Sequence, residues 1–185
     1  WAMKLYGQLL DHNDAYLFKL RQIEEAIKIN FWPEHNQVNK VYHEKLFLKE
    51  AEQALPYFRT GFTPANYYHM FDASANGLML LLNLATTEQE NQIGNFMTSL
   101  FASLGHDLVP AFWPPIKPGD DLWNDLENNY AYDFKNKPHH FHNGGIWPVM
   151  MGILCMGLSQ SSLSEYCKTI YDAYLKLALM DGMNF

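Results

Sequence analysis

The stretch KNKPHHFHNGGIWP, residues 135–148, runs directly into the apolar segment VMMGILCMGL, residues 149–158. Pro148 suits the first turn of a helix, where its missing backbone N–H breaks no hydrogen bond. The sequence therefore predicts a polar loop that leads into a buried helix over residues 146–158. Gly144 and Gly145 permit either positive φ or a close approach of the backbone to a ligand.

The polar residues of this loop allow two interpretations. On spacing alone, Asn143 is the N-cap of the following helix and His142 is a buried, hydrogen-bonded histidine. In the alternative, His142 and Asn143 hydrogen-bond to a ligand, and the ring of Trp147 packs against an apolar face of that ligand. His140 belongs to the same set of candidate ligand contacts, and the family resemblance given below implies that the ligand is a saccharide.

The three loop histidines, His139, His140 and His142, also raise the question of a metal. Their spacing is not a usual zinc-ligand pattern, and no second Cys/His cluster accompanies them. We therefore expect solvent-facing histidines, no metal and no cofactor. Two cysteines, Cys155 and Cys167, are too few for a disulfide framework and favour a reduced, cytosolic compartment.

Helical periodicity extends over most of the chain and predicts an all-α protein of antiparallel helical hairpins, in a single domain over residues 1–185. The aromatic segment 56–73 is interpreted as a loop or a short hairpin. Residues 105–145 contain five prolines and are interpreted as a long functional loop. The expected helices cover residues 2–11, 14–30, 38–54, 74–86, 87–104, 146–158 and a segment from 162 onward, with capping boxes at Thr87-Glu-Gln-Glu90 and Ser162-Leu-Ser-Glu165.

Composition narrows the possible partners. Aromatic residues make up 15% of the 185-residue chain, which fits either a large core or a cleft that stacks flat ligands or sugar rings. The net charge is −7 and no basic cluster stands out, so neither nucleic acid nor an anionic membrane surface is an expected partner. No apolar run is long enough to predict a membrane span.

Asp72 and Arg59 are two further candidates for saccharide contact. Asp72 precedes a predicted helix, so its default role is that of an N-cap, with a sugar contact as the alternative. Arg59 can bond a ligand oxygen or form a surface ion pair. Four other residues of the long loop each allow two interpretations. Glu127 and Asp133 are solvated acids or active-site carboxylates, and Trp113 and Trp123 are sugar platforms or packing residues.

Three segments carry a family resemblance. FHNGGIWPVMMGIL, residues 141–154, resembles the Tyr-His-Asn-Gly-Gly-x-Trp-Pro segment of the alkaline/neutral invertases and of the amylo-α-1,6-glucosidase debranching enzymes. MFDASANGLMLLLNLATTEQ, residues 70–89, and WAMKLYGQLLDHND, residues 1–14, are similar to two other segments of that family, in the same order. The resemblance implies part of an (α/α)6 toroid and hydrolysis of an O-glycosidic bond, in sucrose or an α-glucan-like saccharide.

Glycoside hydrolysis needs two carboxylates. In the family that this chain resembles, one carboxylate lies just before the segment that corresponds to residues 1–14, and the other lies just after the last helix. The chain is therefore expected to be a piece of a larger hydrolase that is inactive by itself, and its shorter segment 31–60 leaves sucrose itself open as the substrate. Two other classes stay open: a non-catalytic saccharide-binding protein, and an interaction module such as an α-solenoid, for which no regular repeat is found.

Overall fold

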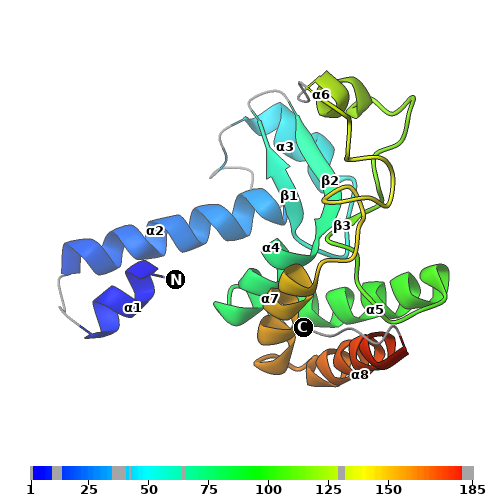
Figure 1. Cartoon of the computed structure of the whole chain (residues 1–185). Coiled ribbons are helices and arrows are strands. Elements are labelled where there is room, and N and C mark those ends of the chain that lie inside the picture. The colour runs from blue at the N-terminus through cyan, green and yellow to red at the C-terminus, as the bar shows by residue number, and fades with distance from the viewer. Residues whose placement is uncertain are drawn as a thin grey trace. The chain divides into compact units, whose positions relative to one another are not determined.

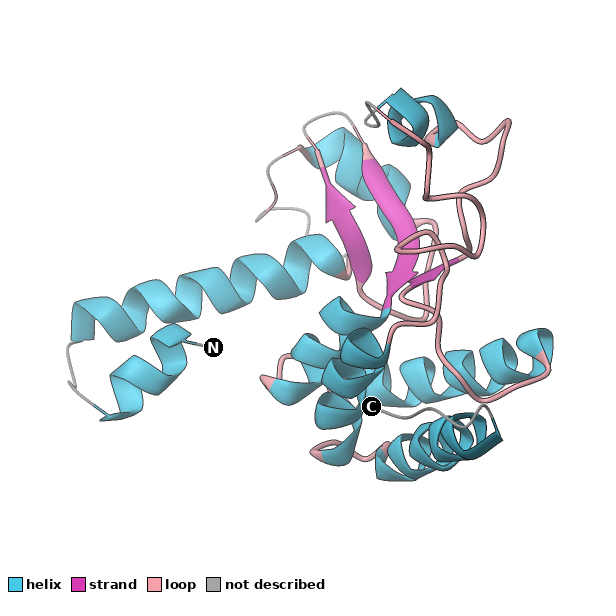
Figure 2. Cartoon of the chain, in the orientation of Figure 1, coloured by secondary structure: helices cyan, strands magenta, loops and turns pink. Residues whose placement is uncertain are grey.

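The computed structural model describes residues 2–9, 14–34, 41, 43–63, 66–128 and 132–180. Within them the chain is mostly helical and carries a small sheet (Figures 1 and 2). The helices are α1 (Ala2–Leu9), α2 (Asp14–Phe31), α3 (Glu44–Ala51), α4 (Ala73–Leu81), α5 (Thr87–Leu104), α6 (Trp123–Asn128), α7 (Pro148–Ser159) and α8 (Ser164–Met180). The strands are β1 (Arg59–Phe62), β2 (Tyr67–Asp72) and β3 (Phe112–Trp113).

The expectation of an all-α fold is wrong in one respect. Figure 2 shows a three-stranded sheet in the order β1-β2-β3, in which β2 and β3 pair antiparallel with Phe71 opposite Trp113. The segment interpreted as a loop or short hairpin is the β1–β2 hairpin, where aromatic residues favour extended backbone. The long region 105–145 supplies both β3 and α6, so it is not structureless.

Both predicted capping boxes need correction. The capping box of α5 uses Thr86 and Gln89, one residue earlier than expected, because Thr86 occupies the N-cap position and its hydroxyl accepts from the Gln89 N–H. The box expected at Ser162 is wrong. The Ser162 hydroxyl and N–H both donate to Oε2 of Glu90, at 2.5 and 3.1 Å, and α8 begins at Ser164.

The chain divides into two compact units. The first comprises Trp1–Leu55 and Gly61–His69, and the second comprises Pro56–Thr60 and Met70–Phe185. The expectation of a single domain stays a prediction. Among the described residues, no helix combines the length and the apolar character that a membrane span requires.

The first unit is held by aromatic contacts and one buried charge. The ring of Phe62 lies 5.4 Å from the rings of both Phe31 and Tyr67, so the end of α2 packs against the hairpin tip. Glu50, at the end of α3, is 2% exposed, and its carboxylate pairs with Nε2 of the half-exposed His69 on β2. A carboxylate this deeply buried requires such partners, since burial disfavours the charged form.

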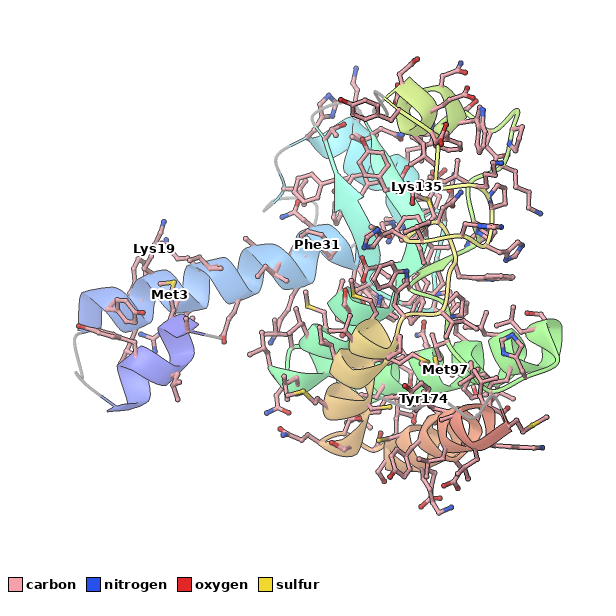
Figure 3. All side chains as sticks on the ribbon, viewed as in Figure 1. Met3, Lys19, Phe31, Met97, Lys135 and Tyr174 are labelled. Carbon is pink, nitrogen blue, oxygen red and sulfur yellow. The ribbon has the colours of Figure 1, made fainter. Side chains whose placement is uncertain are left out.

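The second unit contains the main helical core. Helix α7 packs against both α4 and α8, and α5 lies beside them (Figure 1). The Thr98 hydroxyl on α5 is 2.7 Å from the Tyr166 hydroxyl on α8, which ties these two helices together. Met97, labelled in Figure 3, is fully buried. The other fully buried core side chains include Leu80, Ile93, Leu100, Leu154, Leu158 and Ile170.

Two glycines bring α4 and α7 into backbone contact. A Cβ added at Gly157 would lie only 2.1 Å from the carbonyl oxygen of Gly77, and a Cβ added at Gly77 would lie 2.6 Å from the Cα of Leu154. Both distances are far shorter than any real Cβ contact. No side chain larger than hydrogen therefore fits at either position without moving one helix away from the other.

We expect Gly157→Ala to lower the free energy of unfolding by about 3 kcal/mol, because the added methyl must separate α4 from α7. The matched control is Gly152→Ala on the same helix, where an added Cβ meets no atom within 4 Å. That control should leave the stability unchanged or raise it by about 0.5–1 kcal/mol. Urea unfolding followed by circular dichroism measures both, and equal effects of the two substitutions would contradict the proposed contact.

Candidate functional site

The loop that precedes α7 has a strained backbone. His139 has φ 67°, Phe141 has φ 45° and Gly144 has φ 88°, so three of six residues are left-handed. For the two residues with side chains this conformation costs about 1–2 kcal/mol each. Backbone hydrogen bonds hold it in place: the His139 N–H donates to the Asn143 carbonyl at 2.8 Å, and the Gly145 N–H donates to the Phe141 carbonyl at 3.0 Å. Strain supported in this way is typical of functional loops.

The Gly-Gly pair is required by the loop itself. Gly144 takes the positive φ that the sequence predicted as one option. A Cβ at Gly145 would lie 2.3 Å from the carbonyl oxygen of Phe141. The close approach at Gly145 is therefore made to the loop's own backbone, and both glycines serve to fold the loop back on itself.

Asn143 fastens this loop to a distant segment. It is 4% exposed, and its Oδ1 accepts from the Ile116 N–H at 2.6 Å. Its Nδ2 donates to the carbonyls of Ile116 at 2.8 Å and Asn136 at 2.9 Å. The interpretation of Asn143 as an N-cap is wrong, because α7 begins at Pro148 and its N-cap position is Trp147. Both amide hydrogens of Asn143 are occupied by backbone carbonyls.

Asn76 on α4 repeats this arrangement. It is fully buried, its Oδ1 accepts from the Phe58 N–H at 2.9 Å, and its Nδ2 donates to the carbonyls of Phe58 at 3.1 Å and Asp72 at 3.0 Å. We call each of these a backbone clasp: one buried asparagine amide that bonds the N–H and the carbonyl of one distant residue, together with the carbonyl of a second residue. Buried polar groups satisfied in this way stabilise a single loop position.

The side chains of Phe141, His142 and Trp147 form a ring cluster on the loop, in which Phe141 and His142 are exposed and Trp147 is half-buried. The imidazole of His142 stacks on the Trp147 indole with ring centres 4.8 Å apart and planes 15° apart. The Phe141 ring lies 6.2 Å from the same indole and is 45% exposed. His142 is exposed, so its interpretation as a buried histidine is wrong. His140 is also exposed and leaves the same loop.

A small hollow of about 180 Å³ adjoins the loop. Its wall includes the rings of His139, Trp113 and His106, together with Gly144 and Ile146. The Trp113 and His139 ring centres are 6.1 Å apart. The hollow is smaller than the roughly 300 Å³ at which drug-sized ligand pockets begin, so it can take no more than one small ring. No sequence pattern points to His106, because nothing local distinguishes a histidine that follows a helix C-cap.

Asp72 is the N-cap of α4, as its sequence position predicted. Its Oδ1 accepts from the Ala75 N–H at 2.8 Å and from the Ser74 hydroxyl at 2.7 Å. The backbone beside it leads to the loop: the Ala73 N–H donates to the Ala111 carbonyl at 3.1 Å, and the Ala111 N–H donates to the Gly145 carbonyl at 2.8 Å. The start of α4 and the Gly-Gly pair are therefore joined through one intervening residue.

Arg59 lies away from the surface. It is 2% exposed, so the expectation of a surface ion pair is wrong. Burial raises the pKa of the Tyr57 hydroxyl, and the positive charge of Arg59 opposes part of that rise. A direct saccharide contact by Arg59 stays a prediction.

The remaining acids and tryptophans are also placed. Glu127 and Asp133 are exposed, in agreement with the interpretation as solvated acids. Trp123 packs edge-on against Phe134 with ring centres 5.2 Å apart, whereas Trp113 lines the hollow. In the part of the chain that the structure describes, no three His, Cys, Asp or Glu side chains gather closely enough to hold a metal ion.

Comparisons with known proteins point to one family. The family model described as alkaline and neutral invertase matches residues 46–181. The chain is 23% identical over 185 residues to the probable alkaline/neutral invertase A, chloroplastic, of Arabidopsis thaliana. This similarity covers 85% of the present chain and 28% of the relative, so the chain spans less than a third of that protein.

We expect Asn143→Ala to lower the free energy of unfolding by about 2–3 kcal/mol, because it leaves the Ile116 N–H and two carbonyls without their partner. Asn124→Ala is the matched control, since this asparagine is exposed on α6. The control should change the stability by less than about 0.5 kcal/mol. Chemical unfolding of the two variants beside the parent chain makes the comparison. A loss no greater in Asn143→Ala than in the control would show that the clasp carries no stability.

Proposed function

This chain belongs to the alkaline and neutral invertase family, and we propose that it forms part of the saccharide-binding wall of a glycoside hydrolase. The substrate we propose is sucrose or a related saccharide with an O-glycosidic bond. Because the chain corresponds to 28% of its Arabidopsis relative, the activity of the whole protein is part of this proposal. The proposal also includes an (α/α)6 toroid, which helices outside this chain would complete.

The observation that carries the proposal is the stacked pair of His142 and Trp147. A sugar offers apolar C–H faces and a rim of hydroxyls, so it binds where a flat ring and hydrogen-bonding groups stand together. The indole supplies the flat surface, and the imidazole can both donate to and accept from a hydroxyl. The indole is half-buried and the imidazole is exposed. Hydrogen bonds hold the backbone of the loop that carries them, which reduces the ordering that binding requires.

The other predicted site residues divide into direct and indirect roles. His140 is exposed beside the ring cluster, and we assign it a hydroxyl contact. Both described bonds to Asp72 end on Oδ1, which leaves Oδ2 as an acceptor for a sugar hydroxyl. Asn143 and Arg59 are buried, so we assign them positioning roles.

The chemistry we propose needs an acid that protonates the leaving oxygen and a second carboxylate that acts as base or nucleophile. Glu127 and Asp133 are exposed, and Asp72 is engaged as the N-cap of α4. On the family resemblance, which puts the acid and the base in flanking segments, we propose that both catalytic carboxylates lie outside these 185 residues. A likeness to debranching enzymes and a cytosolic location remain predictions.

The binding part of the proposal is tested by titrating the chain with sucrose and with maltooligosaccharides while recording its indole and imidazole NMR signals. We expect a dissociation constant on the order of millimolar, as befits an isolated half-site. Trp147→Ala should weaken binding at least about tenfold, since one face of the sugar loses its platform. Trp123→Ala, which alters a packing tryptophan elsewhere, should leave binding unchanged. Equal losses in both variants would mean that Trp147 is not the platform.

The catalytic part of the proposal predicts that the 185-residue chain hydrolyses neither sucrose nor maltooligosaccharides, whereas a longer protein that includes it does. Release of glucose, measured by a coupled enzymatic assay, distinguishes the two proteins. Turnover by the chain alone would place the two carboxylates within it. A longer protein that binds sugar without hydrolysing it would support the non-catalytic alternative.

A further inference from the structure

Two thiols meet across the α7–α8 hairpin. Cys155 on α7 and Cys167 on α8 are the only cysteines of the chain, and both are free. Sγ of Cys155 lies 3.9 Å from the backbone carbonyl oxygen of Cys167, so the two residues are in direct contact across the hairpin. Because the Cys155 sulfur already contacts the backbone of Cys167, rotation of the two side chains is the movement that a disulfide between them would require.

Small reagents can reach the pair. Both cysteines are half-exposed and line an apolar groove of about 440 Å³ between α7 and α8. Tyr171, Tyr174 and Gly152 form other parts of its wall. Because the groove opens to solvent, a reagent reaches the sulfur atoms without any unfolding of the hairpin.

We propose that Cys155 and Cys167 form a reversible modification site at which a low-molecular-weight disulfide oxidises the two thiols to an intramolecular disulfide. The oxidised form joins α7 covalently to α8. The inference rests on the thiol geometry alone and is independent of the proposed saccharide site.

The reaction runs by two exchanges. The Cys167 thiolate attacks one sulfur of the reagent disulfide, which forms a mixed disulfide and expels one reagent thiolate. The Cys155 thiolate then attacks the Cys167 sulfur, which forms the protein disulfide and expels the second reagent thiolate. The two protons of the cysteines end on the two reagent thiols, and the two electrons lost by the protein are gained by the reagent.

The order of attack follows from the surroundings of Cys155. Burial, together with the neighbouring Cys167 thiol, raises the pKa of Cys155 to about 12. Cys155 is therefore protonated near neutral pH and is the poorer first nucleophile. Its thiolate fraction rises about tenfold for each unit of pH below that pKa, so closure of the disulfide should accelerate steeply as the solution becomes alkaline.

The bond should also stabilise the hairpin. It closes a short loop between the two helices and so restricts the unfolded chain more than the folded one. We expect the oxidised protein to melt at a temperature roughly 5–10 °C higher than the reduced protein.

The test uses the full chain, first reduced, then incubated with glutathione disulfide and analysed by intact mass spectrometry and by thiol titration in denaturant. We expect the loss of two hydrogens, no remaining free thiol, a monomer on a non-reducing gel and full reversal by dithiothreitol. Either a wild-type chain that keeps both thiols or one that accumulates glutathione adducts would overturn the proposal. So would a product that consists only of linked dimers.

Single substitutions identify the order of events. Cys155→Ser should stop at a stable glutathione adduct on Cys167, whereas Cys167→Ser should react more slowly and carry less adduct. An adduct that forms faster on Cys155 would overturn the assignment of Cys167 as the first nucleophile. Should either variant fail to fold, the mass and melting temperature of the oxidised wild-type chain still decide whether the disulfide forms.

Discussion

The backbone contact between α4 and α7 at Gly77 and Gly157 is the constraint on which the second unit depends. Helices that touch through glycine cannot slide or rotate without a clash, because protein interiors have no spare volume. The position of α4 therefore fixes α7, and α7 fixes the end of the loop that precedes it. Hydrogen bonds from the start of α4 through Ala111 to Gly145 fasten the other side of the same loop. The ring cluster is held by core packing as much as by local sequence.

The two backbone clasps explain how a loop so rich in polar groups can adjoin an apolar helix. The side-chain amides of Asn76 and Asn143 form hydrogen bonds with backbone N–H and carbonyl groups of distant segments inside the protein. Because the asparagines make these backbone contacts, the stacked rings of His142 and Trp147 remain accessible to a ligand. Structural and ligand-binding roles are thus divided among neighbouring residues of one loop.

The sequence predicted most of the helices because each depends on a periodic pattern that is local. It did not predict β3, since a strand of two residues acquires its partner only when distant segments meet. The capping box of α5 was misplaced by one residue because Thr86 and Thr87 are adjacent and either hydroxyl can cap a helix. The residues next to Asn143 could not reveal its role, because its hydrogen-bond partner Ile116 lies 27 residues away in the sequence. The hollow beside His139 likewise exists only in the folded chain.

Both clasping asparagines are followed by glycine, the sequence context in which an asparagine is most prone to deamidation through a succinimide. That reaction needs the glycine nitrogen to attack the side-chain amide carbon. In the folded chain the Gly144 N–H is bonded to the His142 carbonyl, Gly77 lies within a helix, and both amides are held by their partners. The folded structure therefore protects both Asn-Gly sequences from deamidation, and deamidation should begin in molecules that have already unfolded locally.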